Sequence, residues 1–458
     1  MKLVLLTCGT EGDTRPLAAL GHALRRVGHE VVLLGDARTL GTAHALGIPA
    51  TPLSGDIREL FADWGQQGPR GTAKAMVALT NKHTAAWMRE TLAAAEGCDA
   101  IVTSGLAGFV GLSVAERLEV PAAIAGMIPL TPSREFASPF LPPAWVPAWL
   151  NRASLAFTNK LFWLAFKQAL NRARAEVLAL PPRKTVWKDL PMLYGISPTL
   201  LPSPKDWPAN ATLCGQWLPP MGESYTPPPA LAAFLAAGTA PVYVGFGSMT
   251  GIDMAAMLGA VIAALDGRRA VFWPGWNGMG DARLPDNVLC IDATPHDWLF
   301  PRMAAVIHHG GSGTTHSALR AGKPSIVMPF AGDQAFWADR LRRLGVAPAA
   351  LRRLLQPSIL SRGKPSSRVR PSLADAWPAK TASPRRSPLS KGCLGGRRRG
   401  CRLLRDPCVG SDPRVCTASM PSVFAILAAF QTAAASMIEM PAPISSSRCS
   451  AKPAARAG

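Results

Sequence analysis

The sequence contains no uninterrupted apolar run of the roughly 18 to 20 residues that a membrane-spanning helix needs. The nearest approach, residues 423 to 438, is shorter and includes Gln431. The N-terminal stretch MKLVLLTCGT has a short apolar run but no full apolar region and no small-residue cleavage site. We therefore expect a first β-strand there rather than a signal peptide or a membrane anchor.

The cysteines lack the spacing of a metal site. Cys8, Cys98, Cys214 and Cys290 are scattered over the first 350 residues, and the other five of the nine lie beyond them, too far apart for a CxxC zinc site. This usage predicts reduced, mostly buried thiols in a cytoplasmic protein. We expect no bound metal and no cofactor.

Acidic residues are scarce in one part of the chain only. Residues 351 to 458 hold 19 Lys and Arg against 4 Asp and Glu, a net of +15, whereas the first 350 residues hold 30 against 25, a net of +5. The formal charge of +20 therefore describes the tail rather than the globular part. For that globular part, the charge gives no reason to expect a nucleic-acid partner.

A chain of 458 residues with 48% hydrophobic residues exceeds what one core usually serves, so we expect at least two domains. The opening reads as strand Lys2 to Cys8, turn Gly9 to Thr14, helix Pro16 to Val27 and strand Glu30 to Gly35. This order predicts an α/β fold with a doubly wound parallel sheet.

A second strand, turn and helix occur later in the chain. Ala304 to His309 reads as a strand, the glycine-rich segment 309 to 314 as a turn, Thr314 to Ala321 as a helix, and Pro324 to Phe330 as the next strand. Such a turn directs backbone N–H groups and the helix dipole at an anion, and suits a phosphate. In the alternative, Ser312 or Thr314 is an ordinary helix cap.

An acid and an amide, Asp333 and Gln334, follow the strand that ends at Phe330. Ligands of open parallel sheets sit at the carboxyl ends of the strands, where these two side chains can bind sugar hydroxyls. In the alternative, Asp333 caps a helix that begins near Ala335.

The segments HHGGSGTT and PFAGDQ resemble the donor-binding signature of the family 1 glycosyltransferases, and most closely that of sterol glucosyltransferases and antibiotic glycosyltransferases. The resemblance covers roughly residues 1 to 348. It implies the GT-B fold of two facing Rossmann-like domains, and a nucleotide-sugar donor bound without metal. The donor-binding residues that it implies are Ser248, His296, His309, Gly311, Ser312, Gly313, Thr314, Asp333 and Gln334.

Asp13 is the candidate catalytic base. The segment Gly12-Asp13-Thr14-Arg15-Pro16 resembles the family element in which antibiotic enzymes carry an aspartate and plant enzymes a histidine that accepts the proton of the acceptor hydroxyl. In the alternative, Asp13 caps the helix that contains Pro16. The strand Asp99 to Ser104 offers only Thr103 or Ser104 where plant enzymes place a supporting aspartate.

Aromatic and proline residues gather between Pro129 and Trp207. Within this region, Leu155 to Leu170 is expected to form an amphipathic helix. The resemblance implies that it lines a lipophilic acceptor pocket; a core helix and a membrane-surface helix remain alternatives, the last because of the neighbouring basic residues.

The sequence predicts residues 1–214 as an acceptor-binding domain, 215–240 as a linker, 241–350 as a nucleotide-sugar-binding domain and 351–458 as a basic tail. The tail is rich in Arg, Ser, Pro and Cys and loses all periodicity. Its composition favours out-of-frame translation, with a genuine basic extension as the alternative. In either case we expect poor solubility and poor or no activity.

The function expected is inverting transfer of a hexose from a donor such as UDP-glucose to a hydroxyl of a sterol or polyketide. The tryptophan and the glutamate that bind uracil and ribose in plant enzymes are absent near His296 and at Ser317, so UDP and dTDP donors both stay open. Alternatives are a sugar-nucleotide epimerase, a non-catalytic nucleotide-sugar binder and a basic-tail interaction protein.

Overall fold

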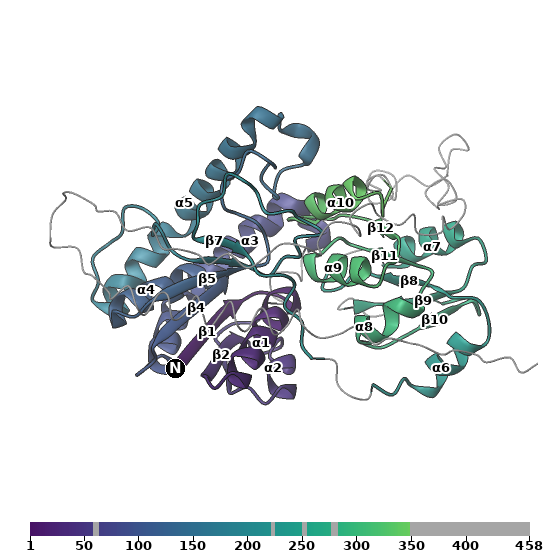
Figure 1. The fold of residues 1–458 in the computed structure, drawn as a ribbon, viewed down its shortest axis with the longest axis horizontal. Coiled ribbons are helices and arrows are strands. Elements are labelled where there is room, and N and C mark those ends of the chain that lie inside the picture. Colours follow the sequence, from purple (N-terminus) through teal and green to yellow (C-terminus); the bar gives the residue numbers. More distant parts are fainter. Residues whose placement is uncertain (58–63, 221–224, 250–253, 276–282, 349–458) are drawn as a thin grey trace, which may run out of the picture. The chain divides into compact units, whose positions relative to one another are not determined.

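The computed structural model describes residues 1–57, 64–220, 225–249, 254–275 and 283–348 (Figure 1). The described residues divide into two compact units, one with residues 1–57 and 70–220, the other with residues 64–69, 225–249, 254–275 and 283–348. Each unit is built on its own sheet of parallel strands. The α/β fold with two parallel sheets is thereby confirmed. The tail beyond residue 348 lies outside the described residues.

The first unit has a seven-stranded sheet in the order β3-β2-β1-β4-β5-β6-β7. Its strands are β1 (Lys2–Cys8), β2 (Glu30–Asp36), β3 (Ala50–Leu53), β4 (Ala100–Gly105), β5 (Ala122–Gly126), β6 (Met192–Tyr194) and β7 (Ala211–Leu213). Its helices are α1 (Glu11–Arg26), α2 (Gly41–Ala45), α3 (Trp64–Ala94), α4 (Gly108–Leu118) and α5 (Asn151–Leu178), with short 3-10 turns η2 (Pro143–Trp145) and η3 (Ala148–Leu150).

The helix α1 begins earlier than the sequence predicts, at Glu11 instead of Pro16. Thr10 is its N-cap, and its hydroxyl accepts the N–H of Gly12 at 3.2 Å while Asp13 accepts the N–H of Thr10 at 2.9 Å. This reciprocal pair satisfies two N–H groups that a helix start otherwise leaves without partners. The expected turn Gly9 to Thr14 is therefore mostly helix, because the capping pair stabilises a start ahead of the proline.

The helix α5 is also longer than expected, at 28 residues, and its C-terminal half is tied to α4. The guanidinium of Arg174 is fully buried and makes two hydrogen bonds to Glu116, at 3.2 and 2.9 Å. Arg183 and the indole of Trp187 donate to the same carboxylate at 2.8 and 3.0 Å. An ion pair with a fully buried guanidinium and this many hydrogen bonds fixes the position of α5 on the unit.

The second unit has a five-stranded sheet in the order β10-β9-β8-β11-β12. Its strands are β8 (Val242–Gly245), β9 (Ala270–Trp273), β10 (Val288–Cys290), β11 (Ala305–His308) and β12 (Ser325–Val327). Its helices are α6 (Pro229–Ala236), α7 (Met254–Leu265), α8 (His296–Leu299), α9 (Ser312–Arg320) and α10 (Gln334–Arg343), with the 3-10 turn η5 (Phe300–Arg302).

Side chains of β8 and β11 alternate between two cores, as parallel strands covered on both faces require. Val242, Val244 and Ile307 belong to the core on the α7 side. Tyr243 and Val306 belong to the core that contains Leu299 and Phe300 of the α8–η5 segment. Burial on both faces fixes the register of the strands, and with it the position of the turns at their ends.

Three negative or mixed findings concern the described part of the chain. None of its helices is both long enough and apolar enough to cross a bilayer. No group of three or more His, Cys, Asp or Glu there has the arrangement of a metal site. Of its four free cysteines, Cys8 and Cys98 are buried, Cys214 is half-buried and Cys290 is exposed, so the expected burial holds only for some of them.

Candidate functional site

The turns after β8 and β11 lie side by side at the carboxyl edge of the second sheet. These strands are neighbours, with Gly245 opposite His308, and the sheet order reverses between them. Such a reversal is the usual ligand crevice of a doubly wound sheet. Residues 246–249 and 309–314, which we call the paired turns, therefore meet where a ligand is expected (Figure 1). Ser248 is half-buried in the first of them.

The ring of His309 lies between glycines of both turns. A Cβ on Gly247 would stand 2.8 Å from Cε1 of His309, and a Cβ on Gly311 only 2.4 Å from its Nε2. No side chain larger than hydrogen fits at either glycine without displacing the ring. Nδ1 of His309 is buried and has no hydrogen-bond partner among the described residues. The two glycines therefore fix the imidazole at the junction of the paired turns.

His308 stabilises the second of the paired turns through a hydrogen bond to its backbone. Its Nδ1 accepts the N–H of Gly310 at 3.1 Å, and its side chain is fully buried. The φ of Gly310 is +94°, a value that side-chain-bearing residues rarely adopt. A Cβ there would also meet Val327 at 2.7 Å. The roles of Gly247, His308 and Gly310 were not predicted, although the spacing of small residues around two histidines is visible in the sequence.

The start of α9 has no side-chain cap. Its N-cap is Gly311, and neither Ser312 nor Thr314 caps the helix. The first backbone bond of the helix is donated by the N–H of Thr315 to the carbonyl of Gly311, at 3.0 Å. The N–H groups of residues 312 to 314 precede that bond and, by helix geometry, point out of the helix end. The cap interpretation is therefore wrong for this turn, and the anion interpretation stays a prediction.

Gln334 joins the loop after β12 to the paired turns. Its side-chain oxygen accepts the N–H groups of Phe330 and Ala331 at 2.7 and 3.1 Å, and its amide nitrogen lies 3.3 Å from the sulfur of Met249. The side chain is buried. In this structure Gln334 therefore closes its own loop and braces the turn that contains Ser248. A contact with a sugar stays a prediction.

Asp333 is the N-cap residue of α10, but its side chain makes no cap hydrogen bond. Instead its carboxylate accepts the indole N–H of Trp337 at 2.5 Å. Burial raises the pKa of Asp333 to about 6, against the opposing effect of the Trp337 hydrogen bond. The cap alternative is therefore wrong here too, and the binding of sugar hydroxyls by Asp333 stays a prediction.

His296 begins α8 and packs into an aromatic group. Its ring stacks on Phe300 at 4.2 Å between centroids and meets the edge of Tyr243 at 5.9 Å. It also lies close enough to His308 for their charges to interact. His296 therefore lies on the paired-turn side of the second unit, with one ring face covered by Phe300.

Three imidazoles around the paired turns are held neutral. Burial lowers the pKa of His308 to about 3, with smaller effects from His309 and His296. Burial lowers the pKa of His309 to about 4. Burial also lowers the pKa of His316 to about 4, against the hydrogen bond that its Nδ1 donates to the carbonyl of Ser312 at 2.7 Å.

We expect the second unit to lose stability steeply as the pH falls from about 6.5 to 4. The three imidazoles gain protons on unfolding in that window, since an unfolded histidine titrates near 6.5. Asp333 acts in the opposite sense between about 4 and 6, because its folded pKa lies above the unfolded value. The net uptake is about two protons, or roughly 2.7 kcal/mol per pH unit.

Denaturant unfolding at a series of pH values measures this slope. The variant His316→Phe removes one buried imidazole and is expected to reduce the slope by about 1.4 kcal/mol per pH unit. A free energy of unfolding that stays level between pH 6.5 and 4.5 contradicts the neutral, buried histidines.

Asp13 lies at the corresponding place in the first unit. The order of that sheet reverses between β1 and β4, and Asp13 follows β1. Its carboxylate packs so tightly that a Cβ on Gly9 would stand 2.2 Å from Oδ2. Asp13 takes part in the cap of α1 as the partner of Thr10, so the alternative interpretation holds in part, and the role of Asp13 as a base stays a prediction. Thr103 of β4, at the strand where plant enzymes place a supporting aspartate, donates its hydroxyl to the backbone carbonyls of residues 107 and 108, at 3.3 and 3.2 Å.

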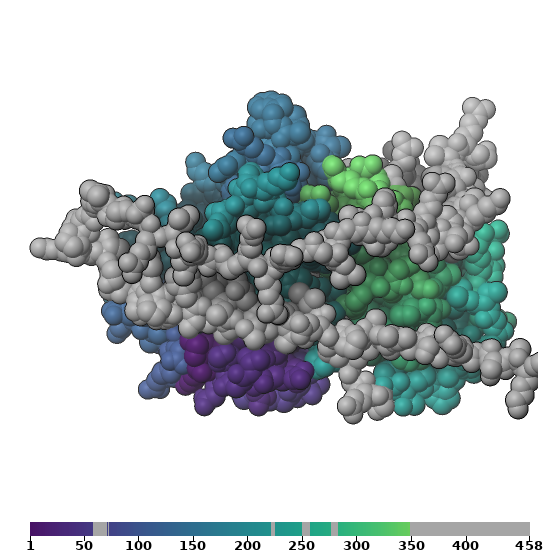
Figure 2. Space-filling view, in the orientation of Figure 1, coloured from purple at the N-terminus to yellow at the C-terminus, as the bar shows by residue number. Residues whose placement is uncertain are grey.

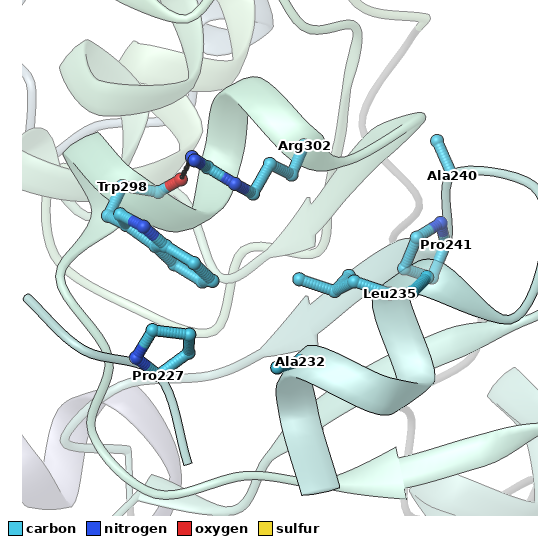
Figure 3. Close-up of a pocket in the computed structure, with 8 residues that line it drawn as sticks. Pro227, Ala232, Leu235, Ala240, Pro241, Trp298 and Arg302 are labelled. Atoms are coloured by element: carbon cyan, nitrogen blue, oxygen red, sulfur yellow. Dashed lines mark hydrogen bonds between the residues drawn. The ribbon is translucent and has the colours of Figure 1, made fainter. Parts of the chain in front are cut away.

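A pocket of about 480 Å³ lies elsewhere in the second unit, between α6 and the α8–η5 segment (Figure 3). The guanidinium of Arg302 lies 4.2 Å from the ring centre of Trp298 and donates to the Trp298 carbonyl at 2.6 Å. Pro241, at the amino end of β8, lines the same pocket. The pocket contains none of the predicted site residues, so it lies away from the paired turns.

Comparison with known proteins finds similarity in sequence. Residues 256–362 match the EryCIII-like C-terminal domain, described as that of an erythromycin biosynthesis protein, and this match extends past the boundary expected at residue 350. A sterol 3-beta-glucosyltransferase of Arabidopsis thaliana is 32% identical over 373 residues, which cover 77% of this chain and 60% of that protein. One of Yarrowia lipolytica is 33% identical over 368 residues, which cover 75% of this chain and 25% of that protein.

The chain thus spans about 60% of the length of the plant relative and a quarter of the fungal one. Among solved structures, a spinosyn rhamnosyltransferase complexed with thymidine diphosphate matches with a TM-score of 0.52 and 21% identity, over 78% of this chain and 88% of that one. The resemblance predicted from the sequence motifs is therefore confirmed, and the fold is that of GT-B glycosyltransferases.

Proposed function

From this likeness to glycosyltransferases, we propose that the chain transfers a hexose from a nucleotide sugar such as UDP-glucose to a hydroxyl of a lipophilic acceptor such as a sterol or polyketide, with inversion. The observation that supports the donor site best is the position of His309 between Gly247 and Gly311, at the reversal of the second sheet. The sterol glucosyltransferases in the comparison suggest the acceptor class.

In the proposed mechanism, the diphosphate of the donor binds to the paired turns. The N–H groups at the start of α9, the imidazole of His309 and the hydroxyls of Ser248, Ser312 and Thr314 stabilise the negative charge that develops as the diphosphate leaves. Fixed donors of this kind contribute several kcal/mol each in a site without water. The positive end of the α9 dipole adds to them.

The acceptor hydroxyl gives its proton to Asp13 and its oxygen attacks the anomeric carbon, so the C–O bond to the diphosphate breaks as the new bond forms. Asp333 and Gln334 bind hydroxyls of the sugar, for which Gln334 has to exchange one of its loop contacts. His296 lies beside the nucleoside. The nucleotide stays open between UDP, as the resemblance suggests, and dTDP, which the spinosyn enzyme binds as thymidine diphosphate.

A transfer assay with radiolabelled donor tests the proposal. The protein is incubated with UDP-glucose or dTDP-glucose, with and without sterols, macrolides and flavonoids. We expect label in the acceptor, joined as the opposite anomer to that of the donor. Donor binding without transfer favours a non-catalytic binder, and conversion of the sugar without acceptor favours an epimerase.

The tail determines which protein suits that assay. We propose that residues from about 351 onward are translated out of frame, and that the chain as written turns over poorly. The frame-corrected protein, in which the alternative reading frame replaces the tail, is then expected to transfer sugar faster. Absence of family-like helices in both other frames contradicts this idea. We further propose a cytoplasmic location and a peripheral contact with membranes, where such acceptors reside.

The variant Gly313→Ala tests whether the diphosphate lies over the start of α9. Gly313 is exposed, and a Cβ there meets no atom within 4 Å. We therefore expect the free energy of unfolding to stay level or rise by up to about 1 kcal/mol, since alanine favours helix over glycine. Donor affinity is expected to fall by about tenfold or more, because the methyl group occupies the place of the phosphate.

Gly259→Ala is the matched control for that variant. Gly259 lies in α7, is exposed, and would likewise carry a Cβ with no atom within 4 Å. It is expected to gain stability in the same way without any change in donor affinity. Thermal unfolding measures the stability, and titration calorimetry measures the donor affinity. Equal donor affinities for Gly313→Ala and the unaltered protein contradict the binding site.

A further inference from the structure

Among the described residues of the first unit, the most exposed large apolar side chains belong to one stretch of chain around the start of α5. They are Trp145 (74% exposed), Trp149 (81%), Phe157 (56%), Leu161 (48%) and Leu164 (56%). The two tryptophans lie in η2 and η3, which lead directly into α5. We call these five residues the aromatic patch; the surface of this segment forms the blue projection at the top of Figure 2.

The first turns of α5 have apolar side chains on their outer face as well as on their inner one, where Leu155 is fully buried. Phe157, Leu161 and Leu164 share one face at helical spacing, and that face is exposed. The side chains turned inward include Ser154 and Thr158, both buried. Ser154 accepts the N–H of Ser138 at 2.9 Å, and Thr158 donates to the Ser138 hydroxyl at 2.7 Å. A surface helix normally places its apolar residues inward, so this exposed apolar face points to a partner.

Basic side chains predominate around the patch, and among the described residues the acidic group that interacts with Arg152 is Asp206, which belongs to another segment. Between Glu135 and Glu176 the sequence has no acidic residue and five basic ones. Arg152 and Lys160 are exposed on the same segment as the patch. A second copy of this face would bring like charges together, which opposes self-association. An anionic surface complements the patch and its basic neighbours.

We propose that the aromatic patch docks on the headgroup region of an anionic lipid bilayer. Tryptophan prefers this boundary, because its ring is apolar and its N–H remains hydrated. Basic residues beside an apolar helix face add attraction to anionic lipids. The Glu116–Arg174 ion pair and the Ser138 hydrogen bonds hold α5 in place, so the patch is a preformed surface. Docking on a bilayer would bring the protein to lipophilic molecules that the proposed function needs as acceptors. The proposal rests on the proposed function only for this choice of acceptor.

Vesicle flotation tests the proposal on the full chain, without donor or acceptor. The probes are phosphatidylcholine vesicles with and without phosphatidylglycerol, at low and high salt. We expect flotation with the anionic vesicles, and an apparent affinity lower by about tenfold or more for the double variant Trp145→Ser/Trp149→Ser. Both side chains are exposed, so thermal unfolding is expected to be unchanged.

Val27→Ser/Leu344→Ser is the matched control, because it removes two apolar side chains of about 41% exposure outside the patch. It is expected to float like the unaltered chain. The basic tail is common to all variants, so its attraction to anionic vesicles cancels in the comparison. Arg152→Glu/Lys160→Glu is expected to reduce flotation at low salt only.

Equal flotation of the double tryptophan variant and the unaltered chain overturns the proposal. So does a change of sedimentation from dimer to monomer without a change in flotation, which identifies a second copy as the partner. Failure of the proposed function appears elsewhere, in the transfer assay with detergent-dispersed acceptors, which needs no membrane. The two ideas can therefore fail separately.

Discussion

Asp13→Asn is expected to lower turnover by about 10²- to 10⁴-fold in the frame-corrected protein, the usual contribution of a general base. The substitution removes the basic carboxylate but keeps an oxygen that can accept the N–H of Thr10, which Asp13 accepts at 2.9 Å. The capping pair of α1 therefore survives, apart from the smaller attraction of a neutral residue to the helix dipole, worth about 0.3 to 1 kcal/mol. Turnover is therefore expected to fall strongly, whereas the free energy of unfolding is expected to change little.

Initial rates with saturating donor and acceptor, together with denaturant unfolding, measure both quantities. Glu11→Gln is the control, because Glu11 lies in the same first turn and is exposed. It loses the same charge near the dipole and is expected to keep its turnover. Asp13→Ala loses the cap as well, and is expected to unfold about 1 kcal/mol more easily than Asp13→Asn. If Asp13→Asn transfers sugar at the unaltered rate, Asp13 is a cap and not a base.

The paired turns were predictable from the sequence because their chemistry is local. A buried strand followed by glycines and a helix start specifies a turn at the carboxyl edge of a parallel sheet, wherever the strand pairs. The local motifs do not by themselves predict that β8 and β11 are neighbours in the sheet. That order follows only from the resemblance to the GT-B fold. The contact of His309 with Gly247, over 60 residues away in sequence, follows from that order.

Three features escaped prediction, each for a reason that involves competing interactions. The start of α1 depends on whether a capping pair outweighs a proline within the helix, and Thr10 decides it. Gln334 faces its own loop because the N–H groups of residues 330 and 331 need an acceptor. The outward apolar face of α5 has the same periodicity as an inward one, so the sequence identifies a helix without revealing which side is covered.

His309→Ala is expected to lower turnover by about 10²- to 10³-fold, the loss typical of one fixed donor to a developing negative charge. The effect on stability is expected to be smaller, because the ring already carries a buried Nδ1 without a partner among the described residues, whose removal offsets part of the lost packing. Turnover in the frame-corrected protein and thermal unfolding of the same preparation measure the two effects. Equal losses of both would indicate a structural histidine.

Two further variants separate the N–H group from the volume of the ring. Gln at position 309 can place an amide N–H near the position of Nε2, the nitrogen closest to Gly311, whereas Leu fills the space between Gly247 and Gly311 without a donor. We expect His309→Gln to recover part of the turnover, and His309→Leu to stay as low as His309→Ala while unfolding at a higher temperature. If His309→Leu matches or exceeds His309→Gln in turnover, packing explains the histidine, and the diphosphate must be stabilised by the α9 N–H groups and the neighbouring hydroxyls without it.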